Sequence, residues 1–352
     1  MIWGKRKNVI GLDIGSSSVK VVELKEGRNG FRLEHFGVSP LPHEAIVDGA
    51  VMDSPTVIDT IRDLWTESKT KTRDVVTSVS GHSVIVKKIS LPLMTESELE
   101  ESIQWEAERH IPFDINDVNI DFQIVGYGSE NPDFMDVILV AAKKDMINDY
   151  VSVIMESGLN PVVVDIASFA VENMLAINYD IEKEETVAIA NIGATVTNLN
   201  ILRNNISAFT RDVFKGGNEV TQEIQRQLHV DYEEAEKIKM GQQGDSSTQS
   251  VVQEVLKTAS ESLATEIGNT LEFFHSTSTY QKISKLYLSG GGAKIKDFDV
   301  ILQQHIGIPV DMTNPFKKIE YSEKEFDVEY MREVGPVMAV GVGLASRKVG
   351  DK

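Results

Sequence analysis

Hydrophobic positions along the 352-residue chain fall into short β-branched runs and into stretches with helical spacing. The first run, residues 9–14 (VIGLDI), is followed by a serine turn and a second run, residues 19–24 (VKVVEL). Apolar runs that flank a small polar turn predict a β-hairpin. Residues 31–38 and 75–80 predict two more strands, whereas the apolar positions of residues 54–65 recur at helical spacing.

The same design appears again about half a chain later. Residues 186–203 (TVAIANIGATVTNLNILR) read as strand, small-residue turn and strand, and residues 206–212 as a third strand. Residues 286–298 (LYLSGGGAKIKDF) then give a strand that runs into three glycines. Self-similarity at this spacing indicates two related halves, each with turns that leave room for a ligand.

The first turn has the chemistry of a phosphate site. Free backbone N–H groups in a turn of Gly15, Ser16, Ser17 and Ser18 form an anion-binding concavity, and Lys20 adds a positive charge. Asp13 precedes the turn and suits a hydrated Mg²⁺, which needs only one or two carboxylates. An isolated Asp-x-Gly-Ser is more often an ordinary hairpin tip; the repeated turns favour the phosphate interpretation. The Walker spacing is absent, and a strand follows the turn instead of a helix.

The pattern of predicted elements changes near residue 84. A strand at residues 84–91 leads to a helix over residues 95–109 that opens on the capping box Thr95–Glu98, and two strands and a further helix follow. We interpret residues 84–163 as an inserted α+β subdomain.

Composition narrows the functional classes. The net charge of −19 argues against non-specific binding to nucleic acid, which requires clustered Lys and Arg. The chain has no cysteine, which excludes disulfides and thiolate metal sites and suits a reducing cytoplasm. Its apolar runs are shorter than the ~18 residues of a membrane span.

The three turns carry a resemblance to a known superfamily. Residues 10–24 are similar to the first phosphate motif of the actin, Hsp70 and sugar-kinase superfamily, residues 189–201 to its second, and residues 288–298 to its adenosine motif. Residues 164–175 and 337–345 resemble its two connecting helices. The resemblance covers the chain nearly end to end and implies an α/β actin-like ATPase fold of two duplicated RNase H-like halves.

The insertion resembles that of bacterial cell-division FtsA, and more closely that of the PilM family of cytoplasmic actin-like proteins in type IV pilus assembly. The chain is short, its C-terminal sequence shows no membrane-binding amphipathic helix, and residues 108–113 (ERHIPF) end the inserted helix. The chain is also similar to the cytoplasmic part of type II secretion GspL. The resemblance implies four subdomains: 1A (1–83 and 164–184), the FtsA-type 1C (84–163), 2A (185–215 and 281–352) and 2B (216–280).

The resemblance also implies ATP and Mg²⁺ as cofactors, with Asp13 near the metal. The residues expected around the nucleotide are Asp13, Gly15, Ser16, Ser17, Ser18 and Lys20 from the first turn, Asn191, Gly193, Ala194 and Thr195 from the second, Gly216, Gly217 and Asn218 beneath the nucleotide, Glu236 and Lys239 at the ribose, and Gly290, Gly291 and Gly292 at the adenosine.

Two positions depart from the hydrolysing members of the superfamily. Asn191 stands where the second phosphate motif normally begins with Asp, and Asp165 aligns loosely with a water-orienting Gln. An amide still joins hydrogen bonds around Mg²⁺, so we expect binding to persist. We expect hydrolysis to be weak or absent, assign no catalytic residue, and note that Asp165 would act as an unconventional base only if it reached the γ-phosphate.

A PilM-like protein docks the short N-terminal cytoplasmic peptide of a membrane partner, PilN, and the cleft between subdomains 1A and 1C is the implied site. The chain is then an ATP-binding scaffold in the cytoplasm, held at the inner membrane only through partners. The sequence leaves open an FtsA-like cell-division or filament-forming homologue, an active ATPase, a small-molecule kinase, and homo-oligomerisation.

Overall fold

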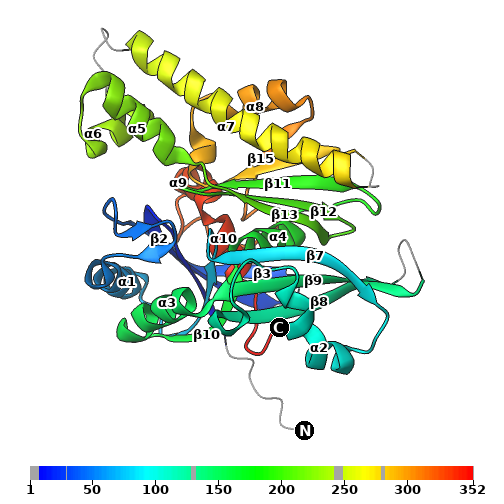
Figure 1. The fold of residues 1–352 in the computed structure, drawn as a ribbon. Helices are drawn as coiled ribbons and strands as arrows, with labels where there is room; N and C mark the ends of the chain where they lie inside the picture. Colours follow the sequence, from blue (N-terminus) through cyan, green and yellow to red (C-terminus); the bar gives the residue numbers. More distant parts are fainter. Residues whose placement is uncertain (1–7, 29, 128–131, 242–248, 279–281, 352) are drawn as a thin grey trace.

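Two five-stranded mixed sheets form the centre of the molecule (Figure 1). The computed structural model describes residues 8–28, 30–127, 132–241, 249–278 and 282–351. The first sheet has the order β10-β6-β1-β2-β3, and the second, read from its other edge, β15-β14-β11-β12-β13. Each is an antiparallel three-stranded meander extended by two parallel strands. The repeat in the sequence is therefore a repeat in the topology.

The strands of the first sheet are β1 (Ile10–Ile14), β2 (Ser18–Gly27), β3 (Gly30–Pro40), β6 (Asp74–Val79) and β10 (Asn160–Ile166). Those of the second are β11 (Thr186–Ile192), β12 (Thr197–Arg203), β13 (Ile206–Val213), β14 (Lys285–Ser289) and β15 (Val310–Met312). A small hairpin joins β4 (Ile46–Val47) to β5 (Ala50–Val51). The central strands β1 and β11 read as apolar runs because both faces of each sheet are covered.

The helices of the two halves are α1 (Ser54–Ser68), α3 (Lys144–Glu156), α4 (Ala167–Asn178), α5 (Gly217–Leu228), α6 (Tyr232–Lys239), α7 (Gln249–Thr277), α8 (Phe298–Ile306), α9 (Val328–Val334) and α10 (Ala339–Ala345). Two short 3₁₀ helices, η2 (Gly292–Lys294) and η3 (Gly335–Met338), accompany them. Helices α5 to α8 lie around the second sheet, in the upper part of Figure 1.

The insertion is a three-stranded antiparallel sheet covered on one face by a helix. Its elements are β7 (Val84–Pro92), α2 (Glu96–Glu108), η1 (Ile115–Asp117), β8 (Val118–Tyr127) and β9 (Phe134–Lys143), with strand order β7-β9-β8. The predicted capping box is present: Glu98 N–H donates to the Thr95 hydroxyl and Thr95 N–H donates to the Glu98 carboxylate. Apolar residues of α2 pack on the sheet and form a separate core.

The structure shortens the range expected for the insertion. Helix α3 packs against the core of the first half through Tyr150, Val153 and Ile154. Strand β10 then pairs in parallel with β6. The insertion therefore ends near Lys143 rather than at residue 163, because a β-branched strand there completes the edge of the first sheet.

The C-terminal helix also crosses to the first half, although the sequence predicted residues 281–352 as part of the second. Helix α10 packs on α4 and β1, and the two helices lie between the sheets (Figure 1). At Gly343 a Cβ would lie 1.7 Å from the carbonyl oxygen of Ala170, so only glycine permits this approach. Beyond the helix, Lys348 forms an ion pair with Glu26 on β2 at 3.2 Å.

Candidate nucleotide-binding site

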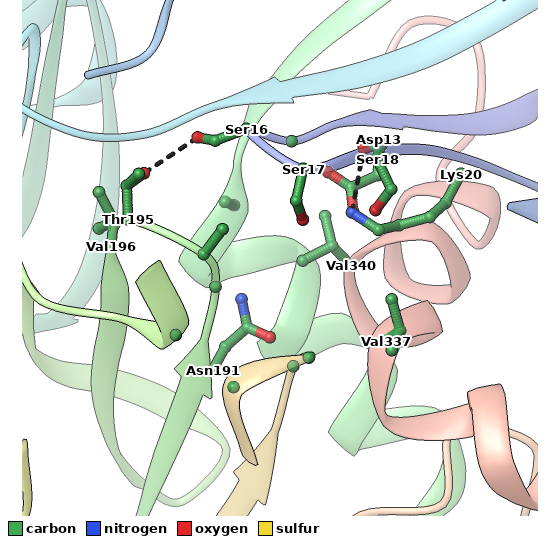
Figure 2. Close-up of a pocket in the computed structure, with 18 of the residues that line it drawn as sticks. Asp13, Ser16, Ser17, Ser18, Lys20, Asn191, Thr195, Val196, Val337 and Val340 are labelled. Atoms are coloured by element: carbon green, nitrogen blue, oxygen red, sulfur yellow. Dashed lines mark hydrogen bonds and ion pairs between the residues drawn. The ribbon is translucent and has the colours of Figure 1, made fainter. Parts of the chain in front are cut away.

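A cavity of about 290 Å³ lies between the two halves, where their hairpin turns face each other (Figure 2). Every residue predicted around the nucleotide lines this cavity except Gly216. Gly216 lies beneath the second turn, close to the carbonyl oxygens of Gly193 and Ala194. The sequence motifs, scattered over about 280 residues, thus meet at one site.

The first turn brings a cation and an anion to the cavity. Asp13 and Lys20 are register partners across β1 and β2, and Lys20 Nζ lies 3.1 Å from Asp13 Oδ2 (Figure 2). The ammonium also donates to the carbonyl oxygen of Ser18 at 3.3 Å, and the Lys20 residue is only 8% exposed. A buried lysine needs such partners. They hold its charge at the wall of the cavity, next to the serine hydroxyls.

The second turn has a chain of amides in the equivalent place. Asn191 and Asn198 are register partners across β11 and β12, and Asn191 Nδ2 donates to Asn198 Oδ1 at 3.2 Å. Ser289 Oγ donates to Asn191 Oδ1 at 3.2 Å, and Asn198 Nδ2 donates to Asp212 Oδ1 at 2.7 Å. Burial raises the pKa of Asp212, although the hydrogen bond from Asn198 acts to lower it. Every amide group named here therefore has a partner, as buried polar groups require.

Helices α5 and α6 form the wall beside the second turn. Lys239 forms an ion pair with Glu236 and donates to Thr221 Oγ1 at 2.9 Å and to the Gly217 carbonyl at 3.3 Å. Thr221 also donates to Glu236. Because Glu236 and Lys239 are three residues apart, they share one face of α6, and this network fixes that face to the start of α5.

The glycine turn after β14 forms the floor. Gly290 has φ of +88°, its N–H donates to the Pro336 carbonyl at 2.8 Å, and a Cβ there would lie 2.3 Å from the Ile192 carbonyl oxygen. Only glycine fits this conformation and this approach to β11. The turn therefore leaves the cavity open while it holds β14 and β11 together.

Direct contacts join the two halves around the cavity. The hydroxyls of Ser16 and Thr195 are hydrogen bonded at 2.9 Å (Figure 2). The N–H of Gly81, just before the insertion, donates to Asp212 Oδ2 at 2.8 Å, and the His82 and Phe214 rings stack with centroids 3.3 Å apart. The structure is therefore one in which the two phosphate turns already touch.

The donor set fits a magnesium ion held with a nucleotide. The described residues contain no group of three or more His, Cys, Asp or Glu arranged to hold a metal by themselves. Mg²⁺ keeps several waters and takes one or two carboxylates together with phosphate oxygens. Asp13, with a side chain that is 14% exposed at the cavity wall, is such a carboxylate.

Several lining residues were missed by the sequence analysis: Gly49, Ser78, Ser80, Tyr150, Ala167, Val196, Asn198, Met240, Lys294, Val337 and Val340. For Asn198 a signal existed, because it follows Asn191 by the seven residues that separate Lys20 from Asp13. Tyr150 had no such signal, since a tyrosine within an amphipathic helix looks like any core residue.

A second cavity, of about 750 Å³, separates the insertion from the first half. One wall is formed by β8 and β9, with Asp121, Gln123 and Val140 among its residues, and the other by β10 and α4. Both β8 and β10 are edge strands of their sheets. The cavity is therefore bordered by two strand edges, the feature to which an extended peptide can add.

Asp165 lies at this second cavity, and it does not line the nucleotide cavity. Its Oδ2 is 3.3 Å from Arg347 Nε, and burial raises its pKa against the pull of the guanidinium. Asp165 therefore does not reach the cavity in which the γ-phosphate is expected, so the condition for its action as an unconventional base is not met.

Comparison with solved structures defines the class of protein. The ethanolamine utilization protein EutJ from Carboxydothermus hydrogenoformans matches over 97% of this chain and 90% of its own, with 15% identity and a TM-score of 0.59. MreB 5 of Spiroplasma citri bound to AMPPNP matches over 96% and 95%, with 14% identity and a TM-score of 0.52. These likenesses show the fold, and the predicted actin-like ATPase fold is confirmed.

The particular family follows from two further matches. The family model for type IV pilus assembly protein PilM matches residues 11–349. A chain of the PilM–PilN type IV pilus biogenesis complex is 30% identical, with a TM-score of 0.88, and the match covers 99% of this chain and 100% of that one. The chain belongs to the PilM family, as the sequence predicted. In its described part, no helix is long and apolar enough to cross a membrane.

Proposed function

We propose that this chain is the ATP-binding cytoplasmic scaffold of a type IV pilus inner-membrane complex. The observation that carries the proposal is the convergence of the two phosphate turns, the α5–α6 wall and the glycine turn on one cavity. Lys20 and the serine turn would contact the β- and γ-phosphates, and Asp13 would hold hydrated Mg²⁺. Membership of the PilM family supports the assignment.

The same cavity supports slow hydrolysis at most. The second turn presents the neutral amides of Asn191 and Asn198, and Asp165 points into the other cavity. No carboxylate of the second turn is thus placed to orient or deprotonate an attacking water. Loss of such a group typically costs on the order of 10²–10⁴ in rate. Binding rather than turnover is therefore the proposed role.

The second cavity is the proposed docking site for a membrane partner. We infer that it takes the N-terminal cytoplasmic peptide of a PilN-like protein as an extended segment along the edge of β8 or β10. A PilM-family match solved with PilN supports this partner. The apolar side chains Val140, Ile147 and Phe169 and the acidic groups Asp121 and Asp351 would contact its side chains.

Nucleotide binding is tested by thermal unfolding with and without Mg²⁺·ATP. A ligand that binds only the folded protein raises Tm, and Lys20→Ala should lose most of the shift because it removes the cation of the first turn. Lys285→Ala is the matched control: it breaks an ion pair of 2.8 Å with Asp311, away from the cavity. The nucleotide assignment fails if no nucleotide at millimolar concentration shifts the wild-type Tm.

Peptide docking is tested by fluorescence anisotropy with a labelled N-terminal peptide of the PilN-like protein. Val140→Asp puts a charge on the wall of the second cavity and should weaken binding at least tenfold. Trp105→Ala is the control, because Trp105 is 73% exposed on α2, which covers the opposite face of the insertion. If Trp105→Ala abolishes binding and a folded Val140→Asp does not, the peptide binds the α2 face instead.

A further inference from the structure

Tyr150 is a buried tyrosine whose hydroxyl has no protein partner among the described residues. The residue lies on α3, is 4% exposed and lines the nucleotide cavity. No hydrogen bond joins its hydroxyl to another residue of the described part of the chain. A buried tyrosine O–H usually finds a partner. A tyrosine hydroxyl that is open to a cavity and has no protein acceptor is available to a ligand bound there.

The surroundings of Tyr150 locate that ligand group. Burial, and to a smaller extent the negative charge of Asp13, raises the pKa of Tyr150 well above its ordinary value. Ser78 and Ser80, at the end of β6, line the same side of the cavity. The phenol therefore lies on the wall of the first half with Asp13, and it keeps its proton, so that it can act only as a donor toward an anion.

We propose that Tyr150 is a further nucleotide-binding residue, whose hydroxyl donates to an oxygen of the terminal phosphate of bound ATP. The inference rests on the proposed nucleotide site and adds to it a group from outside the two phosphate turns. Because ADP lacks the accepting oxygen, this contact makes Tyr150 a determinant of the preference for ATP over ADP. A hydrogen bond to a charged group of this kind corresponds to roughly tenfold or more in affinity.

The proposed contact lies on α3, the helix that connects the insertion to the first half. The helix follows β9 directly, and thus joins the insertion to the first half. Ile147, one turn before Tyr150, lines the second cavity. The proposed contact would therefore connect the terminal phosphate to the helix that separates the two cavities.

The test measures the affinity of the full chain for Mg²⁺·AMPPNP and for Mg²⁺·ADP by isothermal titration calorimetry. Tyr150→Phe keeps the ring and removes only the hydroxyl, and it should weaken AMPPNP about tenfold while ADP changes less than twofold. Tyr179→Phe is the matched control: its hydroxyl accepts from the Asn314 N–H at 2.7 Å, outside the cavity. It should leave both affinities unchanged.

Two results would overturn the inference. Unchanged affinity for AMPPNP would show that the hydroxyl meets no nucleotide group. An equal loss for AMPPNP and ADP would place the contact on a group that both nucleotides share, such as a metal-bound water. Failure of the wild type to bind either nucleotide would instead refute the proposed function, so the two failures are distinguishable. The Tm of the nucleotide-free variant confirms that it is folded.

Discussion

The two hairpin turns that face each other across the cavity share a backbone design and differ in chemistry. In the first, the register partners Asp13 and Lys20 form an ion pair with an N–O distance of 3.1 Å. In the second, Asn191 and Asn198 hold the equivalent register, and a neutral amide hydrogen bond of 3.2 Å takes the place of the ion pair. The duplication therefore repeats the strands and their pairing, but not the charge.

This difference divides the tasks of the site between the two halves. A charged pair supplies both a cation for phosphate and a carboxylate for a hydrated metal, whereas an amide pair orients neighbours without adding charge. Loss of one charged hydrogen bond costs binding about 1.5–3 kcal/mol. Loss of a group that positions the attacking water lowers the rate of hydrolysis by a larger factor. On this basis we propose that the site binds a nucleotide but hydrolyses it slowly or not at all.

The second hairpin keeps its position relative to the first only if the glycine turn after β14 approaches β11 closely. We therefore expect the largest loss of stability from Gly290→Ala. A Cβ at this position has to displace the Ile192 carbonyl and adopt a φ of +88°. We expect a loss of about 3 kcal/mol in the free energy of unfolding, and loss of nucleotide binding. Urea denaturation and thermal shift measure the two effects.

The neighbouring glycine supplies the control. Gly291 has φ of −66°, and a Cβ there would meet no atom within 4 Å. Gly291→Ala should therefore stay within about 0.5 kcal/mol of wild type. Equal stability of the two variants would mean that the glycine turn does not require the approach seen between Gly290 and β11.

A second variant restores the missing charge to the second hairpin. Asn191→Asp places a carboxylate opposite the first turn, where it can orient or deprotonate water. We expect single-turnover hydrolysis of pre-bound ATP to rise about tenfold or more, with a smaller change in affinity. Single turnover is the proper measurement because product release does not enter it.

Asn198→Asp is the control for the charge itself. It puts the same carboxylate on the neighbouring strand beside Asp212, to which Asn198 now donates, and it should destabilise the protein without raising the rate. A rate that is unchanged in Asn191→Asp would mean that the amide pair does not limit hydrolysis. Wild-type turnover near one per second would make the chain an active ATPase.

The sequence predicted the parts of the site that depend on a single turn. Asp13, the serines and Lys20 are neighbours in the chain, so their turn chemistry is visible without knowledge of the fold. The internal repeat then predicted the second turn. The same repeat also indicates Asn198, at the position equivalent to Lys20. The fold class followed from the resemblance of these motifs, in their order along the chain, to those of the actin, Hsp70 and sugar-kinase superfamily.

The subdomain boundaries and the remaining site residues depend on which sheet a segment joins. Local sequence does not specify the sheet. Residues 160–166 read as a β-branched strand wherever they pair, and only the structure shows them beside β6. The small residues of α10 indicate close packing, but not that α4 is the partner. The same limit explains why the sequence left the position of Asp165 open and why it omitted Tyr150, since their positions depend on the packing of β10 and α3.

The smallest expected effect, on the pH dependence of stability, concerns β2 and β12, which are the second (return) strands of the two hairpins. Two residues after Lys20, Val22 is a buried apolar residue that faces α10. Two residues after Asn198, Asn200 instead donates to Glu172 Oε2 on α4 at 3.0 Å. Burial raises the pKa of Glu172 to about 7, against this hydrogen bond. At this position the second sheet thus contacts a titratable carboxylate of α4 through Asn200, whereas the first sheet presents the apolar Val22.

The raised pKa of Glu172 predicts a pH dependence of stability with a definite sign. Between the ordinary pKa of Glu and about 7, the folded state binds a proton that the unfolded state has released, so stability falls as the pH rises through this window. Between pH 6 and pH 8 the wild type should lose about 1 kcal/mol more than Glu172→Gln, which keeps the acceptor for Asn200 and cannot titrate. Urea denaturation at pH 6, 7 and 8 measures the difference.

Two checks isolate Glu172 as the cause. Burial also raises the pKa of Asp212, but Asp212 remains in the variant, so its contribution cancels in the comparison. Glu67→Gln changes an exposed glutamate on α1 and should follow the wild-type pH dependence. If Glu172→Gln and wild type lose stability equally between pH 6 and pH 8, Glu172 is already ionised in the folded protein, and its contact with Asn200 adds no pH dependence to the stability.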